Sequence, residues 1–327
     1  MNISTGKYKK EKSIVMENDT LKAMVLPYWG SKIVSIIYKP KNIELLWQNP
    51  GTDYKRTRYG DLFESGEFSG FDEMFPTISR CMYEGFPWEG IELPDHGEVW
   101  SIPWMYEIAE ESVSLWVYGV RFPYRLEKIV LLEEDCIYLK YRAVNLSSFP
   151  LDFIWAAHTL FNTSEEMELI VPQGMGHIIN SVSGPRLKKY GEILDFPDTL
   201  LEDGNTFHLG RMPARNDFGY QKYYFSEKMT EGWCILYDRK KSLNIGMCFP
   251  KEKVSYLGVW VNEGGWEGQY NMAPEPATGA MDRVDFAKMW GMNSVLPPHG
   301  RYEWHLYISV KAGKKAGGMK ENGEFVC

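Results

Sequence analysis

Short runs of β-forming residues, either alternating between apolar and polar or continuously apolar, recur along the chain. The clearest runs cover residues 31–38, 113–120, 127–134, 136–146, 151–161, 232–238, 242–249, 254–261 and 301–310. Turn-rich pieces such as YKPKN, NLSSFP and LPPHG separate them, and no long amphipathic pattern with a period of 3.6 stands out. The pattern therefore predicts an all-β fold, a large antiparallel β-sandwich whose long loops gather at one rim.

Composition supports the strands, and the length by itself allows one or two domains. Aromatic residues make up 15% of the 327 residues, with 12 Trp and 20 Tyr, and such side chains fit a half-buried sheet surface. No compositional seam or fixed-period repeat divides the chain, so we expect a single domain over residues 1–312 and a polar, flexible tail over 313–327. Residues 56–100 and 180–230 are expected to be long loops, either functional or irregular hairpins.

Charge and cysteine usage narrow the function classes. The formal net charge of -8 and the sequence pI of about 5.4 argue against a nucleic-acid partner, which would favour a basic face. No uninterrupted apolar stretch is long enough for a membrane span or an export signal, so we expect neither. The cysteines form an odd set without C-x-x-C spacing, which favours reduced thiols and a cytoplasmic location: Cys81, Cys136, Cys234, Cys248 and Cys327.

Three segments carry candidate chemistry. They are LPDHGEVWSIPW around His96, WAAHTLFNT around His158, and APEPATGAMD around Glu275. An imidazole can give or take a proton near neutral pH, and a carboxylate can accept one. Together these groups could move protons at both ends of a reacting bond. Most aromatic rings should fill the core, but those beside such polar groups could form an apolar floor for a sugar.

The order and local sequence of these segments resemble the aldose 1-epimerase family, also called galactose mutarotase-like. HTLFN resembles the family's histidine followed by an aromatic residue and Asn at the end of a central strand. YLGVWVNEGGWEGQYNMAPEPATGAMD resembles its late tryptophan strand and the Glu-Pro-x-x-Gly loop that follows. FPTISR through LPDHGEVWSIPW resembles the hexose-6-phosphate-epimerase-like branch, in which an early histidine before Gly precedes a Pro-Trp. The likeness spans most of the chain.

The resemblance implies a β-supersandwich with the sugar in a cleft, and it assigns roles residue by residue. It places the general acid at His158 and the general base at Glu275. It further implies sugar contacts at His96 and Arg80. The glycine-arginine and asparagine-arginine context of the standard mutarotases is missing around Arg80, which leaves galactose itself open as the substrate.

Interconversion of sugar anomers requires the ring to open and close. A base removes the proton of the anomeric hydroxyl while an acid protonates the ring oxygen, and reversal after rotation about C1–C2 delivers the other anomer. This chemistry needs no metal and no redox cofactor, and we expect none. Glu275 would act ionised and His158 protonated, so their mutual field would support the pair if both face one cleft. His96, Arg80 and an aromatic residue such as Trp260 would position the sugar.

Each candidate also has a structural alternative. Strand alternation puts His158 on the same face as the small Ala156, which leaves room beside the imidazole, but a core histidine bound to a backbone carbonyl fits the same pattern. His96 could be a solvated turn residue. Glu275 could be a surface-loop acid, although the prolines on either side stiffen its backbone.

Other polar groups add less. The remaining histidines lack metal-ligand spacing, so we expect no metal site. The run YKRTRYG at residues 54–60 could bind a sugar phosphate or form a solvated charged loop.

Two further function classes stay open, because a fold does not fix activity. One is a non-catalytic carbohydrate-binding or regulatory protein, and the other is a glycoside hydrolase or lyase with paired carboxylates or a tyrosine base. The expected partner is a monosaccharide or a sugar phosphate. The identity of the sugar and the oligomeric state, with a homodimer as one option, are left open.

Overall fold

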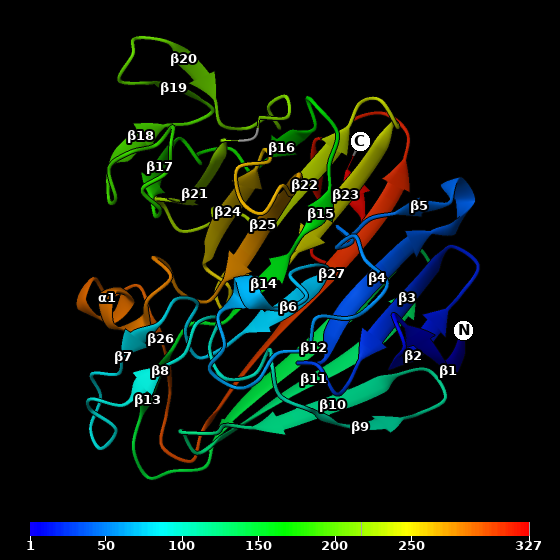
Figure 1. The fold of residues 1–327 in the computed structure, drawn as a ribbon, viewed down its shortest axis with the longest axis vertical. Coiled ribbons are helices and arrows are strands. Elements are labelled where there is room, and N and C mark those ends of the chain that lie inside the picture. Colours follow the sequence, from blue (N-terminus) through cyan, green and yellow to red (C-terminus); the bar gives the residue numbers. More distant parts are fainter. Residues whose placement is uncertain (217, 327) are drawn as a thin grey trace. The chain divides into compact units, whose positions relative to one another are not determined.

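The computed structural model describes residues 1–216 and 218–326, and these are almost entirely β-structure (Figure 1). They fall into two compact units built from interleaved segments of the chain. The first unit comprises Met1–Thr159 and Ala277–His305, and the second comprises Leu160–Pro276 and Leu306–Cys327. Two strands, β25 (Asn271–Ala277) and β27 (Arg301–Ala312), contain residues of both units. The predicted all-β fold is confirmed.

The first unit contains most of the N-terminal half of the chain. Its elements are β1 (Asn2–Tyr8), β2 (Glu11–Glu17), β3 (Leu21–Leu26), β4 (Lys32–Tyr38), η1 (Lys39–Lys41), β5 (Ile43–Glu44), η2 (Phe63–Ser65), β6 (Phe71–Met74), β7 (Cys81–Met82), β8 (Glu92–Leu93), β9 (Met105–Ile108), β10 (Val113–Tyr118), β11 (Tyr124–Glu133), β12 (Cys136–Asn145), β13 (Leu151–Phe153), β14 (Ala156–Thr159), α1 (Val284–Met289) and β26 (Ser294–Leu296).

Antiparallel pairing organises this unit. One run follows the order β1, β2, β3, β4, β6 and β14, and β14 also pairs with β25 through Ala156 opposite Ala277. A second run follows the order β12, β11, β10 and β9. The alternation that predicted β11 is visible in its burial, because every second side chain from Tyr124 to Leu132 is buried.

A buried charge network ties these strands together. The ammonium of Lys128 lies 3.0 Å from Glu73 Oε1 and donates to Ser31 O at 2.6 Å. Tyr141 Oη and Trp155 Nε1 donate to the same carboxylate at 2.9 and 2.8 Å. Burial lowers the pKa of Lys128, and the charge of Glu73 opposes that shift. Because buried charges are tolerated only when they are paired, this network fixes β6 against β11, β12 and the segment leading into β14.

The second unit is built from shorter strands. Its elements are β15 (Phe161–Asn162), β16 (Glu168–Ile170), β17 (His177–Asn180), β18 (Ile193–Asp195), β19 (Asp198–Leu200), β20 (Thr206–His208), β21 (Tyr220–Phe225), β22 (Trp233–Asp238), β23 (Leu243–Cys248), β24 (Tyr256–Asn262), β28 (Gly318–Met319) and β29 (Phe325–Val326). One antiparallel run follows the order β25, β24, β21, β17 and β18, and another follows the order β16, β22, β23 and β27.

The segment after residue 312, predicted to be a polar and flexible tail, contributes to a buried cluster of the second unit. Its strands β28 and β29 form an antiparallel pair with Met319 opposite Phe325. Ala316, Met319 and Phe325 are buried in one cluster with Trp233. The apolar residues are spaced among glycines and lysines, so the composition of the segment gives no sign of this packing.

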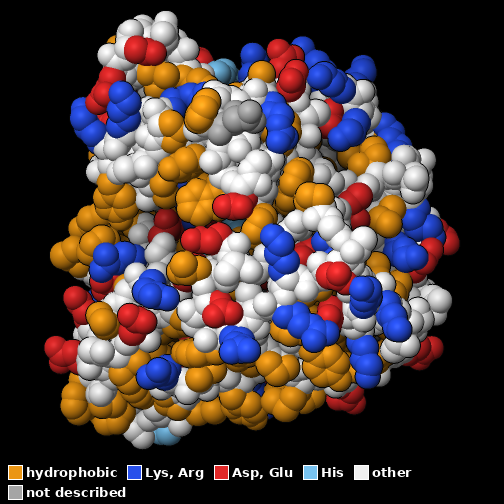
Figure 2. Space-filling model, in the orientation of Figure 1, with side chains coloured by type: hydrophobic (Ala, Val, Ile, Leu, Met, Phe, Trp, Pro, Cys, Tyr) orange, Lys and Arg blue, Asp and Glu red, His pale blue; other side chains and the backbone are white. Residues whose placement is uncertain are grey.

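On the face shown in Figure 2, basic and acidic side chains are interspersed. Within the described residues, no helix is long and apolar enough to cross a membrane. The thiols of Cys81, Cys136, Cys234 and Cys248 are buried, while Cys327 lies outside the described residues.

Phe325→Ala should lower the free energy of unfolding by about 3 kcal/mol, because it leaves a cavity in the buried cluster that contains Trp233. Urea denaturation followed by tryptophan fluorescence measures the change. Val326→Ala is the matched control, since Val326 is 45% exposed and such a surface change stays within about 0.5 kcal/mol. Equal stability of the two variants would contradict the packed hairpin.

Candidate active site

His158 and His96 meet within the first unit, although they are far apart in the sequence. His158 lies in β14, opposite Asp72 of β6, and is only 6% exposed. Its ring centroid is 5.1 Å from that of His96 and 4.9 Å from that of Phe63. The two histidines singled out in the sequence therefore form one cluster.

An aromatic cluster supports the two imidazoles. Phe63, the first residue of η2, stacks on His96 with ring centroids 4.1 Å apart and an interplanar angle of 13°. Trp100 meets Phe63 edge-on at 5.3 Å and His96 at 6.2 Å. Phe63, Phe68 and Trp100 are buried together. Sequence reasoning missed Phe63, because nothing in its local pattern links it to a histidine that follows three strands later.

His96 is held by a turn with an uncommon backbone. It has a φ of 58°, and Gly97 has a φ of 75°. A Cβ on Gly97 would lie 2.1 Å from Phe75 O, so the close approach of these two backbone segments requires glycine. His96 N donates to Ile78 O at 2.6 Å, and its Nδ1 lies 3.2 Å from Asp95 Oδ2. These contacts fix both the backbone and the orientation of the ring.

A buried ion pair lies on the strands next to the histidines. Lys32 Nζ is 3.0 Å from Asp72 Oδ2, and both side chains are almost wholly buried. Burial raises the pKa of Asp72, and the charges of Lys32 and His96 oppose that shift. Lys32 Nζ also lies 5.8 Å from the ring centroid of Phe63. The pair keeps this part of the core balanced in charge beside the strand that carries His158.

Arg80, predicted to contact the sugar, is exposed in the first unit. Its Nη2 donates to Gly60 O at 3.4 Å, which joins it to the loop that contains the basic run. Within that run, Arg56 pairs with Glu11 at 2.7 Å. The structure therefore places Arg80 beside this loop, and its role in sugar binding stays a prediction.

Glu275 lies in β25 with a wholly buried side chain. In the second unit, Lys222 Nζ of β21 is 2.9 Å from its Oε2, and the Lys222 side chain is 10% exposed. The same ammonium is 5.9 Å from the ring centroid of Tyr224. A Cβ on Gly258 of β24 would lie 3.5 Å from Glu275 Oε2, so glycine leaves space beside the carboxylate. Sequence reasoning missed Lys222, because it lies in the stretch 180–230 that is expected to be a long loop, whereas the structure has strand β21 there.

Trp260, the predicted aromatic contact, lies opposite Lys222 in β24. Its ring centroid is 5.8 Å from that of Tyr220 and 5.9 Å from that of Trp266. Trp266 is 37% exposed, and the other two rings are half-buried. A partly exposed aromatic group thus adjoins the lysine that binds the predicted base.

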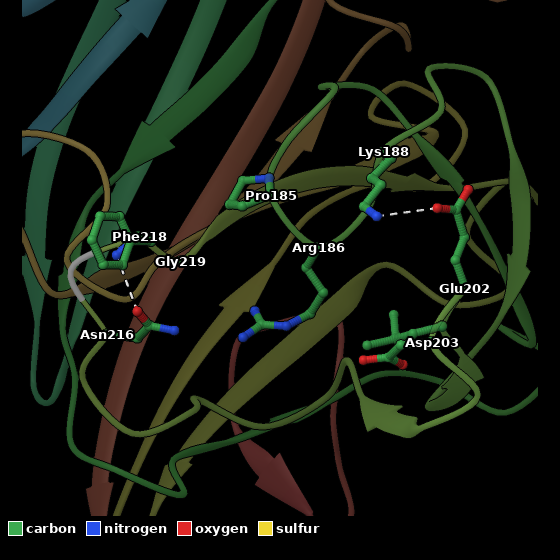
Figure 3. A pocket seen from close by; sticks show the side chains of 9 residues that line it. Pro185, Arg186, Lys188, Glu202, Asp203, Asn216, Phe218 and Gly219 are labelled. Carbon is green, nitrogen blue, oxygen red and sulfur yellow. Dashed lines mark hydrogen bonds and ion pairs between the residues drawn. The ribbon is translucent and has the colours of Figure 1, made fainter.

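A separate pocket of about 240 Å³ lies in the second unit (Figure 3). Its lining comprises Pro185, Arg186, Lys188, Leu201, Glu202, Asp203, Asn216, Phe218 and Gly219. Its cations are already engaged, because Arg186 Nη2 donates to Glu263 Oε2 at 2.9 Å and Lys188 Nζ lies 3.2 Å from Glu202 Oε2. None of the predicted site residues lines this pocket.

Solved structures share the fold of this chain, while no protein-family model and no curated protein matches it. A protein from Synechocystis sp. PCC 6803 is 16% identical, with a TM-score of 0.69 and coverage of 95% of this chain and 99% of that one. A galactose mutarotase-like protein from Lactobacillus casei ATCC 334 is 18% identical, with a TM-score of 0.66 and coverage of 91% and 100%. An aldose epimerase homologue from C. elegans is 12% identical, with a TM-score of 0.60 and coverage of 95% and 100%. The predicted galactose mutarotase-like sandwich is confirmed as the fold.

Gly97→Ala should destabilise the protein by more than about 2 kcal/mol, because both the positive φ and the contact with Phe75 O disfavour a Cβ. Gly90→Ala is the matched control, since Gly90 has a φ of 80° but open space around its Cβ position. Its cost should be about 1 kcal/mol. Chemical denaturation gives both values, and NMR of the histidine rings should show a displaced His96 only in Gly97→Ala. A displaced His96 ring in both variants would contradict the role of the turn.

Proposed function

We propose that this protein is an aldose 1-epimerase-type isomerase, which interconverts the α and β anomers of a free or phosphorylated aldose. The observation that carries the proposal is a buried carboxylate, Glu275, held by the ammonium of Lys222. It lies in β25, within the second unit. In this proposal the carboxylate of Glu275 is the base and the imidazole of His158 is the acid that ring opening requires.

In the proposed reaction, Glu275 removes the proton of the anomeric hydroxyl while protonated His158 gives its proton to the ring oxygen. The bond between C1 and the ring oxygen breaks, and C1 becomes an aldehyde that can rotate about C1–C2. On closure, His158 recovers its proton from the attacking hydroxyl, and Glu275 returns its proton to the new anomeric oxygen. Both residues end in their starting protonation states, so the cycle consumes no co-reactant.

The remaining site residues are proposed to position the sugar. His96, stacked on Phe63, offers a hydrogen-bonding group whose orientation is fixed. Trp260 offers an apolar face for the sugar ring, and Arg80 offers a cation for a hydroxyl or a phosphate. Groups held in place before the substrate binds reduce the entropy that must be lost in the reaction.

The free, buried cysteines bear on the cellular compartment in which the protein acts. Buried, reduced cysteines suit a reducing environment, so we propose that the protein acts in the cytoplasm on a monosaccharide or a sugar phosphate.

His158→Asn and Glu275→Gln should each slow anomer exchange by roughly 10²- to 10⁴-fold, because each removes one proton-transfer group and keeps a side chain of similar size. Exchange NMR on a panel of free aldoses and hexose 6-phosphates measures the rate above spontaneous mutarotation. Retained activity in either variant would remove that residue from the mechanism.

Two exposed residues provide matched controls for these substitutions. The side chains of His177 and Glu303 are 55% and 53% exposed, so His177→Asn and Glu303→Gln should keep the wild-type rate. A wild-type protein that binds a sugar in calorimetry without speeding exchange would favour the non-catalytic binding protein. Release of a new reducing end from an oligosaccharide would favour the hydrolase or lyase.

A further inference from the structure

Lys222 occupies a position where strand alternation usually puts an apolar side chain. It is in the middle of β21, which is buried over most of its length, and Lys222 itself is 8% exposed. Its neighbours across the pair with β24 are Trp260, directly opposite, and Gly258, which lies opposite Tyr224. A lysine at such a position loses hydration and needs a partner to remain charged.

The carboxylate of Glu275 supplies that partner and has the same need. With its side chain at 0% exposure, a lone carboxylate would favour the neutral form, and a protonated carboxyl cannot act as a base. An ammonium at 2.9 Å acts against this effect because it favours the ionised form. Each group therefore favours the charged form of the other.

The local packing leaves room for this contact. A Cβ at Gly258 would lie 3.0 Å from the ring of Tyr224, a tight contact, and 3.5 Å from Glu275 Oε2, an ordinary one. Lys222 Nζ also lies 5.9 Å from the ring centroid of Tyr224 in β21, and Trp260 of β24 is the residue directly opposite Lys222.

We propose that Lys222 is a positioning residue, which keeps Glu275 ionised and fixes its orientation for proton abstraction. This inference rests on the proposed function, in which Glu275 is the base. The effect of Lys222 on the charge of Glu275 can nevertheless be measured in the protein without substrate. It assigns a role to a residue that acts through Glu275 and need not touch the sugar.

The first test follows the Glu275 carboxyl directly. The protein is labelled with 13C at the glutamate side-chain carboxyls, and Glu275→Gln identifies the resonance by its loss. In Lys222→Met, the titration midpoint of Glu275 should rise by about one to three pH units relative to wild type. Lys222→Arg, which keeps the cation, should leave the midpoint near its wild-type value. An unchanged midpoint in folded Lys222→Met would overturn the proposal.

A control on another buried ion pair separates this effect from a general loss of packing. Arg186 Nη2 donates to Glu263 Oε2 at 2.9 Å in the same unit. Arg186→Met should move the resonance of Glu263 and leave that of Glu275 unchanged. If Lys222→Met does not fold, Lys222→Gln takes its place, because it removes the charge and keeps a hydrogen-bond donor.

The second test is kinetic and distinguishes the two proposals. In Lys222→Met, the acidic limb of the profile of kcat/KM against pH should move upward with the Glu275 midpoint. If the wild-type protein has no epimerase activity but the Glu275 midpoint still depends on Lys222, the proposed function is wrong and the effect of the ion pair stands. An active wild-type protein whose acidic limb does not move in Lys222→Met would overturn the role of Lys222 and keep the function.

Discussion

The ion pair between Lys222 and Glu275 is the contact on which the proposed chemistry depends. A carboxylate in an apolar sheet is useful as a base only if it stays charged, and burial alone favours the neutral acid. The 2.9 Å contact between Lys222 Nζ and Glu275 Oε2 opposes that tendency without exposing the carboxylate to water. Gly258 lies beside this contact, and a Cβ there would come within 3.0 Å of the ring of Tyr224.

In the first unit, the two histidine side chains are held in position by other interactions. There the two imidazoles are positioned by backbone geometry and ring stacking, with His96 fixed by a left-handed turn and stacked on Phe63. The buried pair of Lys32 and Asp72 keeps the adjacent strands balanced in charge. Polar groups in this unit are thus held by rigid elements, which is what a site needs if its groups are to be in place before a substrate arrives.

Much of the fold could be predicted from the sequence, because long alternating runs such as β11 and β27 reflect one buried face directly. His96 and His158, whose rings the structure brings together, could be singled out from their local motifs, and their roles stay predictions. Lys222 and Phe63 could not, because their roles come from neighbours that only tertiary pairing supplies. The hairpin around Met319 and Phe325 was missed for another reason. Its few apolar residues lie among glycines and lysines, so the composition of the segment does not indicate that they pack with Trp233.

The arrangement around Glu275 also limits how strong a base it can be. An ammonium partner stabilises the carboxylate and so lowers its affinity for a proton, whereas the surrounding apolar sheet raises that affinity. A general base works best when its pKa lies near the working pH. A carboxylate therefore benefits from surroundings that raise its pKa, provided that it stays ionised. Because the side chain of Lys222 is only 10% exposed, its charge is screened less by water than that of a solvated lysine would be.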